Sequence, residues 1–436
     1  MSDISFWRPV YQLFKPDESL VGQELRDFYV RREDSPVDSL TNLLAMEDEP
    51  AKFLLAGHRG GGKTTELRRL EHRCTGEYTV VWVDTDTALD KFNIGYAEVV
   101  VLIGIKILER LNEGGWNLPA NLRQELLDSL AKVVYQKKAD AEGTIQLPKL
   151  FQDAGVLLKV GFQRGTTGVL EIRPALSDII GKVNAIIRTA EANNNSKLLV
   201  IVDGLDRRDF GAALEMFSSS LLTELKCHII YAIPIALRYS PSFRQPMEGF
   251  QKCLDLANIP VFECNQNSCP TTKPDAVGRS ILAQVVEKRL AKLGDTYKTL
   301  FERDALEQLS EKSGGVMRDL VRLSRTACEV ASQKKSDNVD LAIAQEAIRK
   351  ERETYTIEDY HYSELDKVRR LGKLSSTAFD SPRQGRIVVC DELLHHKLVL
   401  GYHNPKRGRW FDINPILSED LDRWRATNAQ RHDNPS

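Results

Sequence analysis

The chain has 436 residues, with 60 lysines and arginines against 62 aspartates and glutamates and a formal net charge of −2. This length predicts two or three domains, and the balanced charge excludes a protein whose whole surface is a basic coat for nucleic acid. No apolar run approaches the roughly 20 residues of a transmembrane helix, the first residues lack the pattern of a secretion signal, and the seven cysteines are not spaced as zinc ligands. We therefore expect a cytoplasmic protein that does not bind membranes.

The first motif along the chain is a phosphate-binding loop. Residues 53–56 form an apolar run typical of a short buried strand, and Gly57–Thr64 read GHRGGGKT, which matches the P-loop pattern GxxxxGK[ST]. Glycines allow backbone conformations in which successive N–H groups converge on phosphate oxygens. The glycines concerned are Gly57, Gly60, Gly61 and Gly62. A helix that begins near Lys63 adds its positive N-terminal end.

Three side chains after the glycines are predicted to bind ATP and its Mg²⁺. Lys63 reaches the β- and γ-phosphates, the hydroxyl of Thr64 ligates Mg²⁺, and Thr65 lies on the α-phosphate side. The alternative is a glycine-rich loop without a ligand. The sequence does not identify the adenine contacts, for which residues 28–33 are a candidate.

The segment after the loop continues with alternating elements. A strand is predicted over 78–84, and apolar periodicity predicts helices over 94–111 and 121–135. Five glycines among short apolar runs interrupt this pattern over 139–172. We interpret that stretch as an insertion, either a hairpin or a flexible loop, which is a mobile surface excursion or a partner contact. A helix over 175–193 follows.

An acidic residue at the end of a second buried strand completes a P-loop site. Residues 198–202 are continuously apolar, as expected for a central parallel strand covered on both faces, and Asp203 follows directly. We predict that Asp203 holds Mg²⁺ as the Walker-B aspartate. Asp206 has two interpretations: it orients or deprotonates the attacking water, or it caps a helix predicted over 210–222.

Further strands are predicted over 227–233 and 258–262. Strands alternating with helices indicate an α/β fold, a P-loop NTPase core with a three-layer arrangement around a parallel sheet and the nucleotide at the carboxyl ends of the strands. From about residue 273 the pattern is helical, with helices predicted over 276–293, 303–312, 316–332 and 339–354. The third of these carries Arg318, Arg322 and Arg325 on or near one face.

The last part of the chain predicts a small separate module. Helices over 364–371 and 392–396 precede two strands, 398–402 and 410–413, joined by a turn, which is the pattern of a winged helix. The predicted domains are an N-terminal linker segment (1–40), a P-loop ATPase core (41–270), an all-α lid (271–355) and a winged-helix domain with its tail (356–436).

Together these motifs resemble bacterial ATPases of the AAA+/STAND assemblage. The resemblance rests on GHRGGGKTTEL, on LLVIVDGLDR, on a lid with Gly-Gly-x-x-Arg and on the terminal winged helix. The Asp-Gly-Leu-Asp-Arg segment is especially similar to the NACHT and KAP branches, and the layout is similar to origin-recognition ATPases. The resemblance implies that residues 57–65 bind ATP, Asp203 is the metal aspartate, Asp206 is the catalytic acid and Arg318 is a sensor-2 arginine at the γ-phosphate. The alternative for Arg318 is an ordinary surface arginine.

Two positions depart from the AAA+ pattern. Gly204 stands where typical AAA+ machines have a glutamate that polarises water, and loss of such a base costs about 10²–10⁴ in rate. We therefore expect slow hydrolysis. Pro234 stands at the customary polar sensor-1 position. Arg238 is then either a substitute sensor, an arginine finger for a neighbouring subunit, or an ordinary solvent-facing arginine.

These features predict an ATP-dependent switch in which nucleotide binding moves the lid and the winged helix. About 50 residues precede the P-loop, so we expect the effector to be a separate protein. The resemblance further implies a homo-oligomer and a role such as anti-phage defence.

Two other functions remain open. One is a DNA-associated ATPase of loader or transposition-regulator type, because residues 361–436 hold 13 Lys+Arg against 10 Asp+Glu and Lys406, Arg407 and Arg409 lie at the wing tip. The acidic start of the candidate recognition stretch, 390–398, counts against it. The other is a nucleotide-locked scaffold without turnover.

Overall fold

The computed structural model describes residues 4–88, 95–116, 118–135, 166–374 and 389–433. Two compact units form the chain. The sheet unit comprises Val37–Ala56 and Leu70–Leu254, and the P-loop unit comprises Met1–Pro36, Gly57–Arg69 and Asp255–Ser436. The three-domain division predicted from the sequence stays a prediction.

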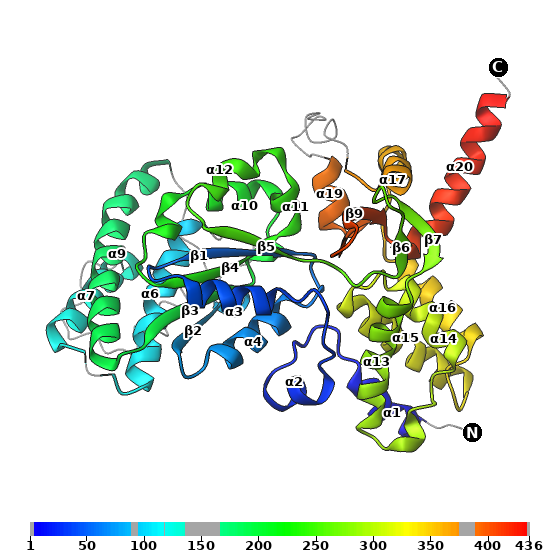
Figure 1. Ribbon diagram of the computed structural model, residues 1–436, viewed down its shortest axis with the longest axis horizontal. Coiled ribbons are helices and arrows are strands. Elements are labelled where there is room, and N and C mark those ends of the chain that lie inside the picture. Colours follow the sequence, from blue (N-terminus) through cyan, green and yellow to red (C-terminus); the bar gives the residue numbers. More distant parts are fainter. Residues whose placement is uncertain (1–3, 89–94, 117, 136–165, 375–388, 434–436) are drawn as a thin grey trace. The chain divides into compact units, whose positions relative to one another are not determined.

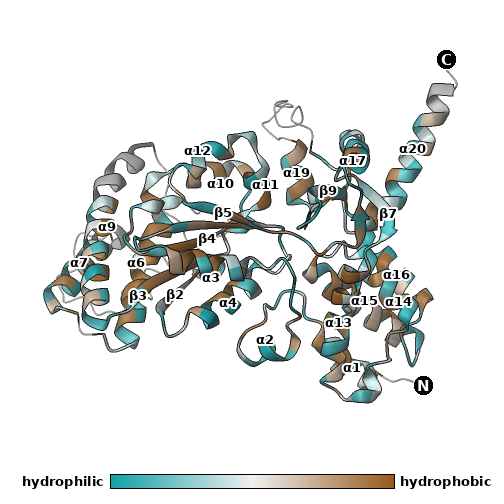
Figure 2. Ribbon diagram, viewed as in Figure 1, coloured by the Kyte–Doolittle hydropathy of each residue, from teal (hydrophilic) through white to brown (hydrophobic). Residues whose placement is uncertain are grey.

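The sheet unit is built around five strands in the order β2-β3-β4-β1-β5 (Figure 1). Their bounds are β1 Lys52–Gly57, β2 Tyr78–Asp84, β3 Lys197–Asp203, β4 His228–Pro234 and β5 Lys252–Leu256. Both β2 and β4 pair in parallel with β3. Every residue of β1 and β4 is buried, and Figure 2 shows β3 and β4 in the brown of hydrophobic residues. Continuous burial is typical of parallel strands with helices on both faces, and the predicted α/β P-loop fold class is confirmed.

The fifth strand was predicted over 258–262, and this prediction is wrong. The fifth strand is β5, in which the charged residues Lys252 and Asp255 alternate with more buried ones, a pattern that is hard to distinguish from a loop in the sequence. Pro260 interrupts the predicted run because proline has no N–H to donate to a ladder. Residues Phe262–Cys264 instead form β6, which pairs antiparallel with β7, Pro270–Pro274.

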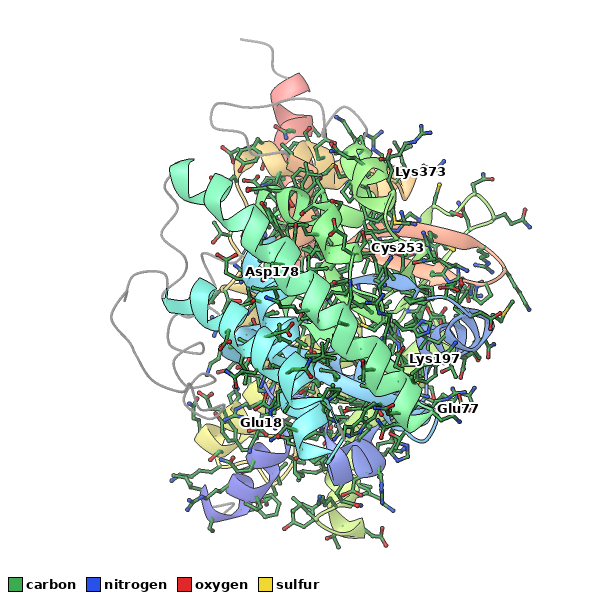
Figure 3. All side chains as sticks on the ribbon, turned by 90° about the vertical axis from the view of Figure 1, so that its left-hand side faces the viewer. Glu18, Glu77, Asp178, Lys197, Cys253 and Lys373 are labelled. Atoms are coloured by element: carbon green, nitrogen blue, oxygen red, sulfur yellow. The ribbon has the colours of Figure 1, made fainter. Side chains whose placement is uncertain are left out.

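Of the helices of the sheet unit, α6 and α7 lie close to their predicted positions, whereas α3, α5, α11 and α12 were not predicted. The helices are α3 Pro36–Met46, α5 Thr85–Ala88, α6 Tyr96–Glu113, α7 Ala120–Tyr135, α9 Thr166–Asn194, α10 Phe210–Phe217, α11 Ile235–Tyr239 and α12 Arg244–Met247, and α4 Lys63–Cys74 begins in the P-loop unit. The helix α6 packs against β2, and α9 packs against β3, α6 and α7. Figure 3, in which Asp178 of α9 is labelled, shows α7 and α9 running side by side.

Two predicted helix boundaries are wrong. The helix α9 begins at Thr166, so 166–172 belong to it rather than to the predicted insertion, and residues 139–165 lie outside the described part of the chain. A glycine inside a helix costs only about 1 kcal/mol relative to alanine, so Gly168 does not stop this helix. The helix predicted over 210–222 ends at Phe217, because the side chain of Ser219 accepts the Leu221 amide and starts a separate 3₁₀ turn.

The P-loop unit contains the predicted C-terminal helices and the predicted hairpin. The helices are α1 Ile4–Leu13, α2 Gly22–Phe28, α13 Ala276–Ala291, α14 Arg303–Lys312, α15 Met317–Lys334, α16 Leu341–Arg352, α17 Asp359–Leu371, α19 Val389–His395 and α20 Ser418–Asp433. Strands β8 (Val399–Asn404) and β9 (Gly408–Ile413) pair antiparallel. The winged-helix assignment stays a prediction.

The N-terminal helix α1 was not anticipated, because Pro9 interrupts its pattern and an interior proline disfavours a helix. Tertiary packing overrides this penalty. The side chains of Trp7 and Val10 are buried, α1 packs against α15, and the Trp7 indole N–H donates to the carbonyl of Ser336 at 3.0 Å.

None of the helices in the described part of the chain combines the length and the apolar character that a membrane span requires.

Replacement of Trp7 tests this packing. Trp7 is 2% exposed, so Trp7→Ala removes a large buried side chain and should lower the free energy of unfolding by about 3–5 kcal/mol. Ile4→Ala, on the exposed side of the same helix, should change it little. Urea denaturation followed by tryptophan fluorescence and circular dichroism measures both, and equal effects of the two variants would show that α1 does not pack as described.

Candidate functional site

The P-loop joins β1 to α4, and its backbone takes conformations reserved for glycine. Gly60 and Gly62 have φ values of +83° and +102°. A Cβ on Gly60 would lie 2.7 Å from the Cβ of Arg318, so the loop and the start of α15 are in direct contact within the P-loop unit. A larger residue at position 60 would be excluded both by its backbone angle and by this contact.

Donors from three parts of the chain bind the carbonyl groups of the loop. Lys63 Nζ donates to the carbonyls of Gly57 at 2.6 Å and His58 at 2.8 Å. The amide of Arg318 donates to the Gly60 carbonyl at 3.0 Å, and Arg32 Nη1 donates to the carbonyl of the next residue, Gly61, at 3.0 Å. Because a trans peptide directs its C=O and N–H oppositely, this anchoring turns loop amides away from the donors. The Gly61 amide is used within the loop, where it donates to the His58 carbonyl at 3.0 Å. Loop amides that converge on one point form an anion-binding cradle in P-loop proteins.

The predicted nucleotide-binding side chains occupy the first turn of α4. Lys63 is 4% exposed, and Thr64 and Thr65 are half-buried. The buried carboxylate of Glu66 follows them, accepting from Ser35 Oγ at 2.6 Å and from Tyr29 Oη at 3.0 Å. The first turn of α4 is thus held to the segment 29–35, part of which was the candidate for adenine contacts.

The strand β3 ends at Asp203, as predicted, and the next residue cannot carry a side chain. Asp203 is the last residue of β3 and is 7% exposed. Gly204 has φ +93°, and a Cβ there would lie 2.6 Å from Thr85 Oγ1. The hydroxyl of Thr85 itself donates to the Asp203 carbonyl at 2.8 Å. A glutamate directly after Asp203 is therefore excluded by the backbone conformation and by Thr85.

The capping interpretation of Asp206 is wrong. The N-cap of α10 is Asp209, whose carboxylate accepts the amide of Ala212 at 2.9 Å, whereas Asp206 lies in the 3₁₀ turn Leu205–Arg207. The register of β2 and β3 places Asp84 directly opposite Asp203. This second carboxylate was not among the predicted site residues, although its position at the end of the predicted strand 78–84 was an available signal.

The three arginines of α15 have different partners. Arg318 Nε donates to the carbonyl of Pro16 at 3.0 Å, and Arg325 donates to the carbonyl of Phe14 at 3.0 Å. Arg322 pairs with Asp319 on its own helix. In the sheet unit, the Arg238 guanidinium lies 5.1 Å from the ring centre of Phe243.

Two polar residues that connect the loop region to β8 were not predicted from the sequence. His58 and Asn258 are both fully buried, and both hydrogen-bond to the backbone of Gly401 in β8. Burial lowers the pKa of His58 to about 3, with further lowering by Lys63 and Lys397 and an opposite effect of the Leu394 carbonyl. His58 is therefore neutral. The loop consensus leaves its position unspecified, so no motif pointed to it.

The basic turn between β8 and β9 is largely paired with acidic groups. Arg409 forms an ion pair with Asp255, and Arg407 lies 3.6 Å from a carboxylate oxygen of Glu263. Lys406 is exposed.

Comparisons with known proteins find similarity among solved structures alone. No protein-family profile matches the chain, and no curated protein matches its sequence. Solved structures that are similar include the ORC2 protein of Aeropyrum pernix in ADPNP and ADP complexes, at 15% identity and a TM-score of 0.46 over 96% of this chain and 98% of that one. The A. pernix ORC1 protein in complex with DNA has 12% identity and a TM-score of 0.40 over 95% and 97%. A Walker-type ATPase of Pyrococcus abyssi has 12% identity and a TM-score of 0.45 over 94% and 99%.

The titration of His58 generates a prediction about acid stability. Its pKa of about 3 in the folded chain lies below the usual 6.5, so the unfolded chain binds the proton first as pH falls. The stability that this histidine contributes is present above pH 6.5 and is lost as pH falls towards 3. Between pH 6.5 and 5 the free energy of unfolding should fall by about 2 kcal/mol more in the wild type than in His58→Gln.

Urea denaturation across this pH range measures the difference. His396→Gln, which replaces an exposed histidine directly after α19, is the matched control and should keep the wild-type pH dependence. Parallel curves for the wild type and His58→Gln would contradict the burial of a neutral imidazole.

Proposed function

We propose that the chain binds ATP at the P-loop and hydrolyses it slowly. The observation that supports this most strongly is the anchoring of the loop carbonyls by Lys63, Arg32 and the Arg318 amide, since it leaves the loop suited to phosphate oxygens. The ammonium of Lys63 rests on two carbonyls of its own loop, and a phosphate offers it a charged partner in their place.

The side chains of Thr64 and Asp203 are also of the chemical type that binds magnesium. A hydroxyl at the start of α4 and a carboxylate at the end of β3 are the oxygen ligands that Mg²⁺ takes in P-loop proteins. We infer that Thr64 and Asp203 hold it. The ion would neutralise phosphate charge. Asp206 is our candidate for positioning or deprotonating water, and the excluded side chain at Gly204 supports slow turnover.

The lid arginine has a defined role in this proposal. Arg318 follows the turn that contacts the loop, its amide bonds Gly60 and its guanidinium bonds the Pro16 carbonyl. We propose that, when ATP binds, the guanidinium gives up its hydrogen bond to the Pro16 carbonyl and binds the γ-phosphate instead. Nucleotide binding would then be communicated to α15 and to the N-terminal segment.

The biological role is proposed on motif resemblance alone. The Asp-Gly-Leu-Asp-Arg segment and the lid resemble AAA+/STAND switches, so we propose that ATP-dependent homo-oligomers engage a separate effector protein in a bacterial defence system. Affinity purification with and without ATP from the native host tests this, and the absence of any ATP-dependent partner would count against it.

ATP turnover should depend on Lys63. We expect Lys63→Ala to weaken ATP binding at least tenfold and to abolish phosphate release, because the loop loses the buried ammonium that is predicted to reach the β- and γ-phosphates. Lys298→Ala, an exposed lysine far along the chain, is the matched control and should match the wild type. Isothermal titration with ATP and a phosphate-release assay measure the two effects.

Asp206→Asn separates an ATPase from a nucleotide-locked scaffold. If Asp206 activates water, this variant should bind ATP as the wild type does and release phosphate about 10²–10⁴-fold more slowly. Wild-type phosphate release no faster than that of Lys63→Ala would favour the scaffold.

The second candidate function, a DNA-associated ATPase, is supported by the net basic C-terminal region and by the exposed Lys406. The pairing of Arg409 with Asp255 and of Arg407 with Glu263 counts against it, because neutralised arginines contribute less to phosphate binding. We expect no binding of duplex DNA at about 150 mM salt. Filter binding across a salt series tests this, and a steep decrease in affinity with salt would favour the DNA-associated function.

A further inference from the structure

One residue of β8, Gly401, connects the P-loop to the C-terminal hairpin through hydrogen bonds of its backbone. The Gly401 amide donates to His58 Nε2 at 3.0 Å. The Gly401 carbonyl accepts the amide of Asn258 at 3.0 Å and its Nδ2 at 3.3 Å. All three residues lie within the P-loop unit, so these contacts belong to one compact body.

The register of the hairpin explains why the N–H and C=O of Gly401 can bind groups outside the hairpin. Gly401 lies opposite Phe411 in the antiparallel pair. The Phe411 amide donates to the carbonyl of Gly372 at 2.8 Å and not across the hairpin, so this is a non-hydrogen-bonded pair. The peptide groups of Gly401 therefore point out from the free edge of β8. An uncovered strand edge is a liability, and here the loop histidine and Asn258 cover it.

His58 binds both the P-loop lysine and β8. Its carbonyl accepts Lys63 Nζ at 2.8 Å, while its imidazole, which is fully buried, accepts from β8. Because the imidazole is neutral, Nε2 keeps its lone pair for Gly401. A movement of the Lys63 ammonium therefore changes the bonding of the same residue that holds the strand edge.

The junction is not fully satisfied among the described residues. Asn258 Oδ1 is buried and has no hydrogen-bond partner there. A Cβ on Gly61 would lie 3.5 Å from Asn258 Oδ1, so this oxygen faces the loop backbone. Unsatisfied buried groups are unfavourable, which makes the junction responsive to small shifts of the loop.

We propose that His58 is a coupling residue through which nucleotide binding at the P-loop orders the β8–β9 hairpin. This inference rests on the proposed ATP binding and specifies its regulation. When Lys63 leaves the carbonyls of Gly57 and His58 for phosphate oxygens, the His58 peptide is held by the ordered loop, and the hydrogen bond to Gly401 carries that order to β8.

Other contacts keep the hairpin in place when the histidine is changed. Tyr402 Oη donates to the Gly314 carbonyl at 3.0 Å, and Lys397, just before β8, lies 2.6 Å from both carboxylate oxygens of Asp319. Replacement of the His58 acceptor alone should therefore remove the coupling without undocking the hairpin.

Hydrogen–deuterium exchange of peptides covering 399–404 tests the proposal, with ATP affinity measured on the same samples. His58→Leu fills the space without an acceptor, His58→Gln restores an acceptor of similar reach, and His396→Leu makes the same chemical change at an exposed site. Circular dichroism verifies that each variant is folded.

Without nucleotide, exchange in this strand should be at least tenfold faster in His58→Leu than in the wild type, and unchanged in His396→Leu. With Mg²⁺ and ATP, exchange should slow at least threefold in the wild type, His58→Gln and His396→Leu, but not in His58→Leu. If His58→Leu does not fold, the same comparison between the wild type and His58→Gln at pH 7.5 still requires the slowing.

Two results would overturn the coupling while leaving ATP binding intact. One is a wild type that binds ATP without a change in β8, and the other is a His58→Leu variant that keeps the wild-type slowing. A wild type that does not bind ATP would overturn the proposed function, and the coupling with it. The nucleotide-free comparison would still measure the His58–Gly401 hydrogen bond in that case.

Discussion

The outward anchoring of the P-loop carbonyl groups is the constraint on which the rest of the P-loop unit depends. A loop of consecutive glycines has no conformational preference strong enough to hold one cradle shape by itself, since glycine loses more freedom on ordering than any other residue. Here the shape is imposed by donors from elsewhere: Arg32 from the N-terminal segment, the Arg318 amide from α15 and Lys63 from α4. The loop therefore has its binding geometry only when these three segments are in place.

The same dependence explains the crowded environment behind the loop. The Gly315 carbonyl accepts the amide of Ile259, and Asn258 in turn bonds the backbone of β8. The turn before α15, the segment around Asn258 and the hairpin thus form a continuous packed layer against the loop. A change in any of them acts on the cradle through these backbone and side-chain hydrogen bonds.

The carboxylate side of the proposed site is arranged differently. Asp203 is positioned by a fully formed parallel strand, and the neighbouring Gly204 adopts a left-handed conformation against Thr85. That geometry excludes the glutamate of typical AAA+ machines, and the carboxylates near this strand end include Asp206, Asp84 and Asp86, the last of which pairs with Arg207. The chemistry available at the end of β3 is in this way limited by backbone conformation.

Local patterns in the sequence predicted most elements, and their failures have identifiable causes. Continuous apolar runs marked β1, β3 and β4, and the glycine pattern marked the P-loop. The edge strand β5 was missed because its charged residues resemble a loop, and α1 was missed because Pro9 resembles a helix break. In both, burial against distant residues outweighed local preference.

The sequence by itself determined the α/β class, the P-loop with Lys63, Thr64 and Thr65, and Asp203 at the end of a buried strand, because each depends on residue types at short spacing. Only the tertiary structure decided that Asp209 rather than Asp206 caps α10 and that His58 and Asn258 hold β8. It also decided that Arg407 and Arg409 are paired with acidic groups. These facts depend on which groups meet across tens to hundreds of residues, and hydrogen bonds and ion pairs between such groups leave no periodic signal in the chain.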